Sequence, residues 1–209
     1  MYQKYFKRLL DIILSLGGII VLAIPMLIIA VAVKLDSKGP VLFWQKRVAI
    51  HKETYMMPKF RSMYTTAPAN MPTHLLTSPD QWITPVGKFL RKTSLDELPQ
   101  LFSIFKGDMS VVGPRPALWN QYDLIAERDK YGANDVRPGL TGWAQINGRD
   151  ELPIDVKARF DGEYVENLSF AMDCKCFIGT IGKVLKRDGV VEGGTGAMEK
   201  EEEKEKSRV

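Results

Sequence analysis

Two adjacent carboxylates, Asp96 and Glu97, are the residues of this chain best suited to chemistry, and they lie in the motif Ser-Leu-Asp-Glu-Leu-Pro at residues 94–99. Neighbouring carboxylates can bind Mg²⁺, or act as a nucleophile and a base. They can equally begin a helix, because a capping box of Ser94 and Glu97 would satisfy free backbone amides. Pro99 favours Asp96 as the N-cap, since a proline at the third helical position removes no hydrogen bond. Both explanations stay open, and in either register the carboxylates lie where helix amides attract anions.

Arginines on short, rigid loops are the second candidate feature. Arg115 lies in Gly-Pro-Arg-Pro, Arg137 begins Arg-Pro-Gly-Leu-Thr-Gly-Trp, and Arg149 ends Gln-Ile-Asn-Gly-Arg. A rigid backbone lowers the entropy cost of bidentate phosphate binding by arginine. One such arginine is more often paired with a surface carboxylate. Three of them, together with Lys59 and Arg61, indicate a phosphate-binding site.

Several other kinds of site are disfavoured by motifs that the sequence lacks. It contains no Gly-x-Gly-x-x-Gly motif, no Walker loop and no Asp-x-Asp pair. With two histidines and two cysteines, Cys174 and Cys176, neither a disulfide scaffold nor a zinc site is expected, and no Ser or Cys nucleophile has a plausible histidine partner. The two cysteines fall on different faces of a predicted helix, and we expect Cys174 to pack in the core.

The excess positive charge is concentrated near the start of the 209-residue chain. The net charge is +4, and residues 1–47 carry seven basic and two acidic side chains, whereas residues 48–198 carry 18 of each. A nucleic-acid-binding protein would carry its basic patch on the folded body, so we expect no nucleic-acid partner. The basic residues flank an apolar run instead, as expected of a segment that contacts anionic membrane lipids.

The apolar run Ile12–Val33 is a predicted membrane element. It has 22 residues without a charge, of which 14 are Ile, Leu or Val, and is long enough to cross a bilayer. However, basic residues flank it on both sides, and lysine and arginine favour the cytoplasmic side. Pro25 near its middle bends a helix. These features favour a re-entrant helix hairpin with both ends cytoplasmic, and a single membrane-spanning anchor is the alternative.

The rest of the chain is expected to form one compact domain. The predicted fold class is α+β, predominantly helical, with a short β-hairpin and amphipathic interfacial helices in addition to the re-entrant membrane helix. The predicted domains are a membrane anchor over residues 1–37, a cytoplasmic catalytic domain over 38–192 and a charged flexible tail over 193–209. The predicted elements are strands at 41–48 and 54–57, a long loop at 65–85, and helices at 95–106, 119–130, 155–165 and 169–187.

Two of these helices have an apolar face. The helix at 95–106 is expected to end at Gly107 and the last helix to begin at Ser169, which acts as its N-cap. The expected apolar faces consist of Leu95, Leu98, Phe102 and Phe105 in the first helix, and of Phe170, Cys174, Phe177, Ile178, Ile181, Val184 and Leu185 in the second.

These residues resemble those of the bacterial sugar transferases, the monotopic polyprenyl-phosphate phosphoglycosyl transferases, over roughly residues 2–191. The resemblance rests on the basic start with its apolar helix and on six motifs in the right order. They are Lys-Phe-Arg-Ser-Met at 59–63, Arg-Lys-Thr-Ser-Leu-Asp-Glu-Leu-Pro-Gln at 91–100, Lys-Gly-Asp-Met-Ser at 106–110, Gly-Pro-Arg-Pro at 113–116, Arg-Pro-Gly-Leu-Thr-Gly-Trp at 137–143 and Asn-Gly-Arg at 147–149.

The resemblance implies transfer of a sugar 1-phosphate from a UDP-sugar to undecaprenyl phosphate, with release of UMP, as the first membrane step of glycan assembly. It implies that Asp96 is the nucleophile that forms an aspartyl phosphosugar, that Glu97 is the base, and that Mg²⁺ is a cofactor with Asp96 as its ligand. Arg115 and Arg149 would bind phosphate. The full set of expected substrate- or phosphate-binding residues is Lys59, Arg61, Arg91, Arg115, Arg137, Gln145 and Arg149.

The expected location is the bacterial plasma membrane, with the catalytic domain on its cytoplasmic face. The expected partners are the UDP-sugar donor, the undecaprenyl phosphate acceptor and membrane lipids, and a homodimer is a candidate assembly. Three other classes remain as alternatives: a membrane-anchored scaffold without activity, a glycosyltransferase that passes on a bare sugar and releases UDP, and a nucleic-acid-binding protein. The sequence does not identify the sugar.

Overall fold

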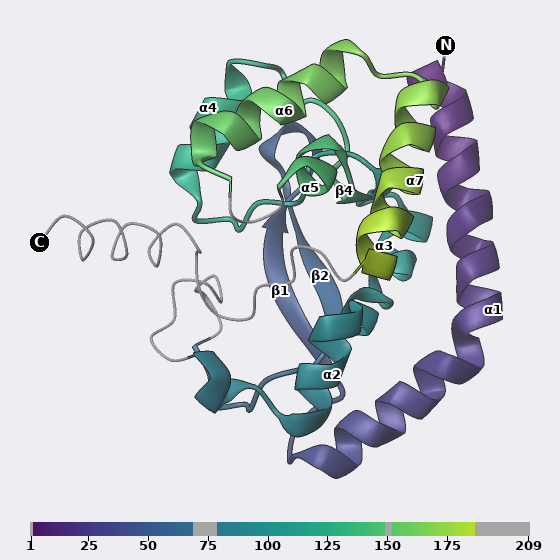
Figure 1. The fold of residues 1–209 in the computed structure, drawn as a ribbon, viewed down its shortest axis with the longest axis vertical. Helices are drawn as coiled ribbons and strands as arrows, with labels where there is room; N and C mark the ends of the chain where they lie inside the picture. The colour runs from purple at the N-terminus through teal and green to yellow at the C-terminus, as the bar shows by residue number, and fades with distance from the viewer. Residues whose placement is uncertain (1, 69–78, 149–151, 187–209) are drawn as a thin grey trace, which may run out of the picture.

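A computed structural model describes residues 2–68, 79–148 and 152–186 of the chain, and this part is mostly helical with small two-stranded sheets (Figure 1). The predominantly helical fold with a hairpin is therefore confirmed. In chain order the elements are η1 (Tyr2–Phe6), α1 (Lys7–Asp36), β1 (Leu42–Val48), η2 (Ile50–Lys52), β2 (Thr54–Phe60), η4 (Pro79–Trp82), α2 (Pro85–Thr93), η5 (Leu95–Glu97), α3 (Gln100–Lys106), β3 (Ser110–Val112), α4 (Tyr122–Asp129), β4 (Gly139–Thr141), α5 (Trp143–Asn147), α6 (Ile154–Glu166) and α7 (Phe170–Lys186).

The apolar run forms most of α1, a single 30-residue helix that continues through Pro25. The helix bends on its way down the molecule in Figure 1, as expected where a proline removes one backbone hydrogen bond. By length and composition it could cross a membrane. Its buried side chains are Lys7, Asp11, Ser15, Met26 and Val33, and most of its other large apolar side chains are exposed. The re-entrant topology stays a prediction.

Polar side chains tie the first turns of α1 to the rest of the molecule. The carboxylate of Asp11 accepts hydrogen bonds from the hydroxyl of Ser110 at 2.9 Å and from the backbone amide of Val111 at 2.8 Å. Arg8 donates to the carbonyl oxygens of Ile104 and Phe105, both at 2.7 Å, near the end of α3. The apolar helix is therefore docked on β3 and α3 through its polar residues.

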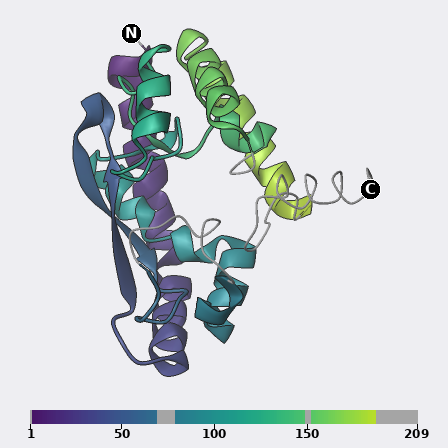
Figure 2. The ribbon, with the colours of Figure 1, turned by 90° about the vertical axis from the view of Figure 1, so that its left-hand side faces the viewer.

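The β1–β2 hairpin is antiparallel, with Leu42 opposite Phe60 and Val48 opposite Thr54. The second strand is three residues longer than predicted, since it continues through Pro58. A proline is tolerated there because β2 has a partner on one edge only, within the described sheets. Figure 2 shows the hairpin on one side of α1 and the α6–α7 pair on the other.

The short parallel pair β3–β4 was not predicted, because three-residue strands are too short for a period-two pattern. Its geometry explains the glycines of two motifs. A Cβ on Gly113 would lie 2.4 Å from the carbonyl oxygen of Arg137, and one on Gly142 would lie 2.1 Å from the carbonyl oxygen of Gly113. A Cβ on Gly139 would lie 2.1 Å from the amide nitrogen of Gly113. Glycine is needed where two backbones approach this closely.

The predicted loop over 65–85 ends in a helix start that the prediction missed. Thr84 is the N-cap of α2, its hydroxyl accepts from the amide of Gly87 at 3.0 Å, and Pro85 occupies the first helical turn. The sequence Thr84-Pro85 indicates such a helix start, because proline is common at the first helical position. Residues 69–78 of the predicted loop lie outside the described residues.

The predicted helix over 95–106 is divided in two, and the capping-box hypothesis is wrong. Ser94 has a left-handed conformation with φ of 56°, ends α2, and makes no side-chain cap to the turn that follows. Leu95–Glu97 is a single 3₁₀ turn, and α3 begins only after Pro99. The alternative with Asp96 as N-cap is also wrong, because Pro99 takes that position. Gly107 ends α3 as predicted, with φ of 107°.

The predicted helices over 119–130 and 155–165 are confirmed as α4 and α6, although α4 is shorter. The hydroxyl of Ser169 accepts from the amide of Met172 at the start of α7, which confirms this cap. The expected burial of Cys174 is wrong, because Cys176 is the fully buried cysteine and packs with Val112 and Tyr164.

The predicted apolar faces are only partly buried. Leu95 and Leu98 pack against a core cluster, as expected, whereas most of the other predicted apolar side chains are exposed. The side chains of Val184 and Leu185 lie outside the described ones. In α3 the buried apolar side chain is Ile104, whereas Phe102 and Phe105 are exposed. In α7 Ile178 is 67% exposed. Helix α1 packs against α3, and the Lys7–Asp173 ion pair joins the start of α1 to the start of α7, whose C-terminal end lies away from α1 in Figure 2. Exposed apolar groups of this extent mark an interaction surface. Its exposed members on α3 and α7 are Phe102, Phe105, Phe170, Phe177, Ile178 and Ile181.

Candidate active site

The two adjacent carboxylates lie in the turn η5 (Leu95–Glu97), between α2 and α3. The left-handed Ser94 ends α2 abruptly, and Pro99 begins α3. This turn packs against β2, so residues of the hairpin meet the carboxylates from across the fold. Two helix ends therefore fix the backbone around Asp96 and Glu97.

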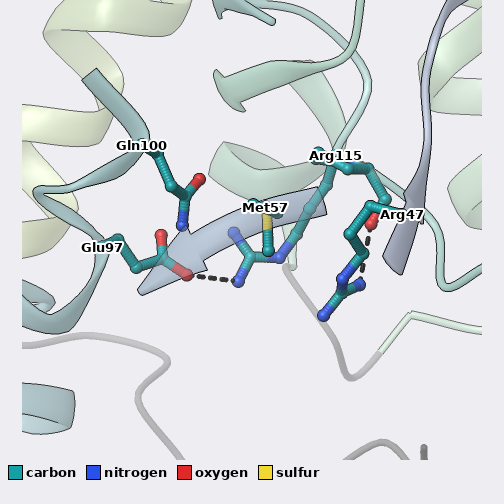
Figure 3. Close-up of a pocket in the computed structure, with 6 residues that line it drawn as sticks. Arg47, Met57, Glu97, Gln100 and Arg115 are labelled. Carbon is teal, nitrogen blue, oxygen red and sulfur yellow. Dashed lines mark hydrogen bonds and ion pairs between the residues drawn. The ribbon is translucent and has the colours of Figure 1, made fainter. Parts of the chain in front are cut away.

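Glu97 is held by two cations that come from distant parts of the sequence. Its Oε1 accepts from Nζ of Lys59 at 2.7 Å and from Nη2 of Arg115 at 2.9 Å (Figure 3 shows the pair with Arg115). Burial by itself would raise the pKa of Glu97. The charges and hydrogen bonds of Arg115 and Lys59 outweigh burial and hold this pKa well below its usual range. Glu97 is therefore ionised in the free protein, and its Oε1 is paired with two cations.

Asp96 has a different environment although it is the next residue. Burial, together with the negative charge of Glu97, raises the pKa of Asp96 to about 6, while Lys59, Arg91 and Arg115 lower it. Two neighbouring carboxylates whose pKa values are driven apart are suited to different roles. Asp96 is still ionised at neutral pH, and its charge is the less stabilised of the two.

The backbone around Arg115 is rigid, as the flanking prolines predict. The carbonyl of Pro114 accepts from the amide of Gly139 at 2.9 Å, which attaches this segment to β4. The carbonyl of Pro116 accepts from Nη1 of Arg47 at 2.8 Å, and the carbonyl of Ala117 accepts from the amide of Val48 at 2.9 Å. Arg115 is thus presented between the parallel pair and the hairpin.

A shallow pocket lies at the Glu97–Arg115 ion pair, and its volume of about 160 Å³ includes open solvent. In this conformation it has no room for even a water-sized group, so a substrate can enter only if the side chains that line it move apart. Arg47, Met57 and Gln100 are not among the site residues predicted from the sequence. Arg47 and Met57 carried no sequence signal, whereas Gln100 lies in a motif but was given no role. The lining consists of Arg47, Met57, Glu97, Gln100, Arg115 and Pro116 (Figure 3).

The structure brings some predicted residues to the carboxylates and places others elsewhere. Lys59, Arg91 and Arg115 act electrostatically on Asp96. Arg61 instead lies buried at the end of α1, where its guanidinium donates to three backbone carbonyls, those of Val33, Ser37 and Lys38.

Two more predicted residues, Arg137 and Gln145, lie elsewhere, and a third lies outside the described residues. Nε of Arg137 donates to the carbonyl of Gly107 at 3.0 Å. Gln145 is buried in α5, and neither end of its amide has a hydrogen-bond partner within the described residues. Arg149 lies outside the described residues.

A magnesium site at Asp96 stays a prediction, and the donor set fits it. The described part of the chain has no group of three or more His, Cys, Asp or Glu residues that could hold a metal. Mg²⁺ does not require one, because it is commonly bound by one or two carboxylates, waters and substrate phosphates. The carboxylate of Asp96 can serve as such a ligand, since its neighbour Glu97 already takes up Lys59 and Arg115.

Comparison with known proteins identifies similar chains. The model of a family described as bacterial sugar transferase matches residues 2–187. An uncharacterized sugar transferase of Bacillus subtilis, EpsL, is 38% identical over 185 residues, which cover 88% of this chain and 89% of that protein. Other relatives have names that state a reaction. The undecaprenyl-phosphate galactose phosphotransferase of Salmonella typhimurium is 35% identical over 201 residues, and the UDP-glucose:undecaprenyl-phosphate glucose-1-phosphate transferase of Escherichia coli is 39% identical over 189.

The alignments cover most of this chain but only part of those two enzymes. They include 90% and 87% of the chain, and 42% and 40% of the two relatives. The chain therefore spans about two fifths of the length of these enzymes, whereas it matches the Bacillus protein over nearly its whole length.

Proposed function

The chain belongs to the bacterial sugar transferase family, and from this premise we propose that it transfers a sugar 1-phosphate from a UDP-sugar to undecaprenyl phosphate. Two relatives carry names that state such a reaction, with galactose and with glucose. The observation that carries the proposal is the Asp96–Glu97 pair beside Lys59, Arg91 and Arg115, because one site offers a nucleophile and three phosphate-binding cations.

In the first step the carboxylate of Asp96 attacks the β-phosphorus of the UDP-sugar. A bond forms between Asp96 and this phosphorus, the bond from the phosphorus to the bridging oxygen breaks, and UMP leaves. With a pKa of about 6, Asp96 is ionised at neutral pH and needs no base. Lys59 and Arg115 bind the phosphate oxygens, where charge develops.

In the second step an oxygen of undecaprenyl phosphate attacks the same phosphorus and releases Asp96. Glu97 accepts the proton of the attacking phosphate if that group is protonated. Glu97 is a weak base while Lys59 and Arg115 pair with it. Substrate phosphates compete for these two cations, which raises the pKa of Glu97 and makes it a stronger base.

Mg²⁺, the proposed cofactor, would be held by Asp96 together with the diphosphate of the donor, whose charge it neutralises. The cations of the chain bind the remaining phosphate oxygens. Such a division of labour is common in phosphoryl transfer, where positioning and electrostatic stabilisation supply most of the catalysis.

Membrane association follows from the surface of the described residues. Exposed apolar side chains cover α1, α3 and α7, and Phe102 and Phe105 of α3 come shortly after Asp96 and Glu97 in the sequence. We propose that this surface enters one leaflet of the bacterial plasma membrane from the cytoplasmic side, with α1 re-entrant. The site would then lie near the head group of the lipid acceptor.

The proposal is tested by nucleotide release. Purified protein is incubated with undecaprenyl phosphate, Mg²⁺ and a panel of UDP-sugars, and UMP and UDP are measured separately. We expect UMP with at least one sugar, none with Asp96→Asn, and undiminished release with Asp155→Asn, a matched exposed control in the first turn of α6. With the UDP-sugar alone, mass spectrometry should find one sugar phosphate on the wild-type chain. UDP release, or UMP release by Asp96→Asn, would overturn the mechanism.

The topology is tested by cysteine labelling. Single cysteines at Gln3 and Lys38, both exposed, are introduced into a Cys174→Ser background and labelled in intact spheroplasts with a membrane-impermeant reagent. A re-entrant α1 leaves both positions protected until the membrane is opened. Labelling of one position from outside would establish a membrane-spanning helix instead.

A further inference from the structure

Gln100, the first residue of α3, has a buried amide that lacks a partner. The residue is only 2% exposed, and its Nε2 has no hydrogen-bond acceptor among the described residues. Burying an N–H group without an acceptor destabilises a folded protein. Such a group is therefore expected to gain a partner in another state of the molecule.

The position of this amide identifies the place where the partner would bind. Gln100 lines the pocket at the Glu97–Arg115 ion pair, and in Figure 3 its amide nitrogen faces the space between these two side chains. The other buried polar side-chain atoms without a partner in the described structure are on Tyr55, Arg61, Gln145 and Asp161, none of which lines this pocket.

We propose that Nε2 of Gln100 donates a hydrogen bond to a phosphate oxygen of a substrate bound in this pocket, which rests on the proposed function. The chemistry of the lining favours an acceptor ligand. Gln100 offers an N–H donor, and Arg47 and Arg115 bring positive charge, whereas Oε1 of Glu97 already accepts from two cations. A phosphate group has only acceptor oxygens when it is fully ionised, and it can bind to several of these donors at once.

A neutral donor contributes to phosphate binding differently from the charged side chains of the site. Lys59 and Arg115 neutralise charge, and both are held by Glu97 in the free protein. Gln100 can orient a bound phosphate without neutralising its charge. Its amide is held in place by burial and by the backbone of Pro99 before it. Gln100 thus contacts the substrate directly and aligns the phosphorus for attack.

Both substrates carry phosphate, so the experiment must separate them. In a two-step reaction, kcat/KM for the UDP-sugar reports the first step and kcat/KM for undecaprenyl phosphate reports the second. Gln100→Met keeps the length of the side chain and removes the donor. We expect the value for one substrate to fall roughly 10- to 100-fold, the size expected for a lost hydrogen bond to a charged group. The substrate affected identifies the phosphate that Gln100 contacts.

Thermal stability distinguishes this role from a structural one. Because Gln100→Met removes an unpaired buried donor, its melting temperature should equal or exceed that of the wild type. Asn134→Leu is the matched control, since the buried amide of Asn134 donates at 2.8 Å to both Ile125 and Asp129. It should lower the melting temperature and leave kcat/KM of the folded enzyme unchanged.

Three results would overturn the inference: unchanged kcat/KM for both substrates, a loss of activity that parallels a loss of stability, or an active Gln100→Glu variant, in which an anion replaces the donor. UDP-sugar binding, followed by the rise in melting temperature, separates this inference from the proposed function. If the wild type binds the UDP-sugar and releases no UMP, the proposed function fails. Equal affinities of the wild type and Gln100→Met for both the UDP-sugar and undecaprenyl phosphate would then reject the role of Gln100, and a weaker affinity of the variant for either substrate would support it.

Discussion

Lys7 of α1 and Asp173 of α7 form a buried ion pair that joins the first and last described helices. Nζ of Lys7 lies 2.5 Å from Oδ2 of Asp173, and the side chains are 10% and 12% exposed. The hydroxyls of Tyr2 and Tyr164 also donate to this carboxylate, at 2.6 and 2.7 Å. Removal of either charge leaves the other buried and incompletely compensated.

We predict that Lys7→Met lowers the free energy of unfolding by about 3–5 kcal/mol, the cost of breaking a buried ion pair by removing one partner. For a chain of this size, each kcal/mol lowers the melting temperature by roughly 2–4 °C, so the expected decrease is about 6–20 °C. The measurement is thermal unfolding in one detergent at a fixed scan rate, followed by circular dichroism.

The double variant Lys7→Met with Asp173→Asn tests the physical reason. It should be more stable than the sum of the two single effects, because no charge is left buried without a partner. Lys52→Met is the matched control, since Lys52 pairs with Asp129 at 3.1 Å where both side chains are about half exposed. Surface pairs contribute only about 0–1 kcal/mol. Equal effects of Lys7→Met and Lys52→Met, or additive effects in the double variant, would refute the reasoning.

Three more predictions concern the site and the apolar surface. Arg61→Met should lower the melting temperature and leave kcat/KM of the folded enzyme unchanged, because three carbonyls at the end of α1 lose their donor; a large loss of activity at unchanged stability would instead place Arg61 in the site. In a pH profile, kcat/KM for the UDP-sugar should fall below an apparent pKa of about 6, because Asp96 must be ionised to attack; a limb near pH 4 would contradict this. A fluorophore on Ile178→Cys, in a Cys174→Ser background, should be quenched by brominated lipids in vesicles, whereas one on Asp155→Cys should not; equal quenching would show that α7 does not enter the lipid.

Much of the fold could be predicted from local sequence signals. The hairpin, α4, α6 and the start of α7 follow patterns that need no tertiary information, such as alternation, helical periodicity and the cap at Ser169. The errors arise where local preferences compete. Ser94 could begin a helix or end one, and it ends α2 because Pro99 is better placed to begin α3. The β3–β4 pair depends on long-range contact of Gly113 with Gly139, which no local pattern contains.

The apolar periodicity of α7 can be recognised from the sequence, but it does not identify what covers the apolar face. A stripe of apolar side chains shows which face of a helix avoids water, and it does not show whether protein or lipid covers this face. In α7 the small Cys176 faces the core, and the larger Phe177 and Ile178 are exposed. The apolar helix α1 in the same chain indicates that membrane lipid, rather than protein, can cover the apolar face of α7.

The candidate site shows the same limit at the level of single residues. Lys59 and Arg61 are two positions apart in one motif, and sequence alone treats them as equivalent phosphate-binding cations. Strand β2 ends between them at Phe60, so Lys59 reaches Glu97 while Arg61 turns to the end of α1. Gln100 shows the opposite error, since it lines the pocket but was not predicted there. Its residue type and its place after Pro99 are ordinary for a helix start. Only the burial of an unpaired amide beside Glu97 marks it, and this property exists only once the chain has folded. Proteins tend to break general rules, such as the pairing of buried polar groups, at their functional sites. The unpaired donor of Gln100 therefore indicates a role in binding rather than a defect in packing.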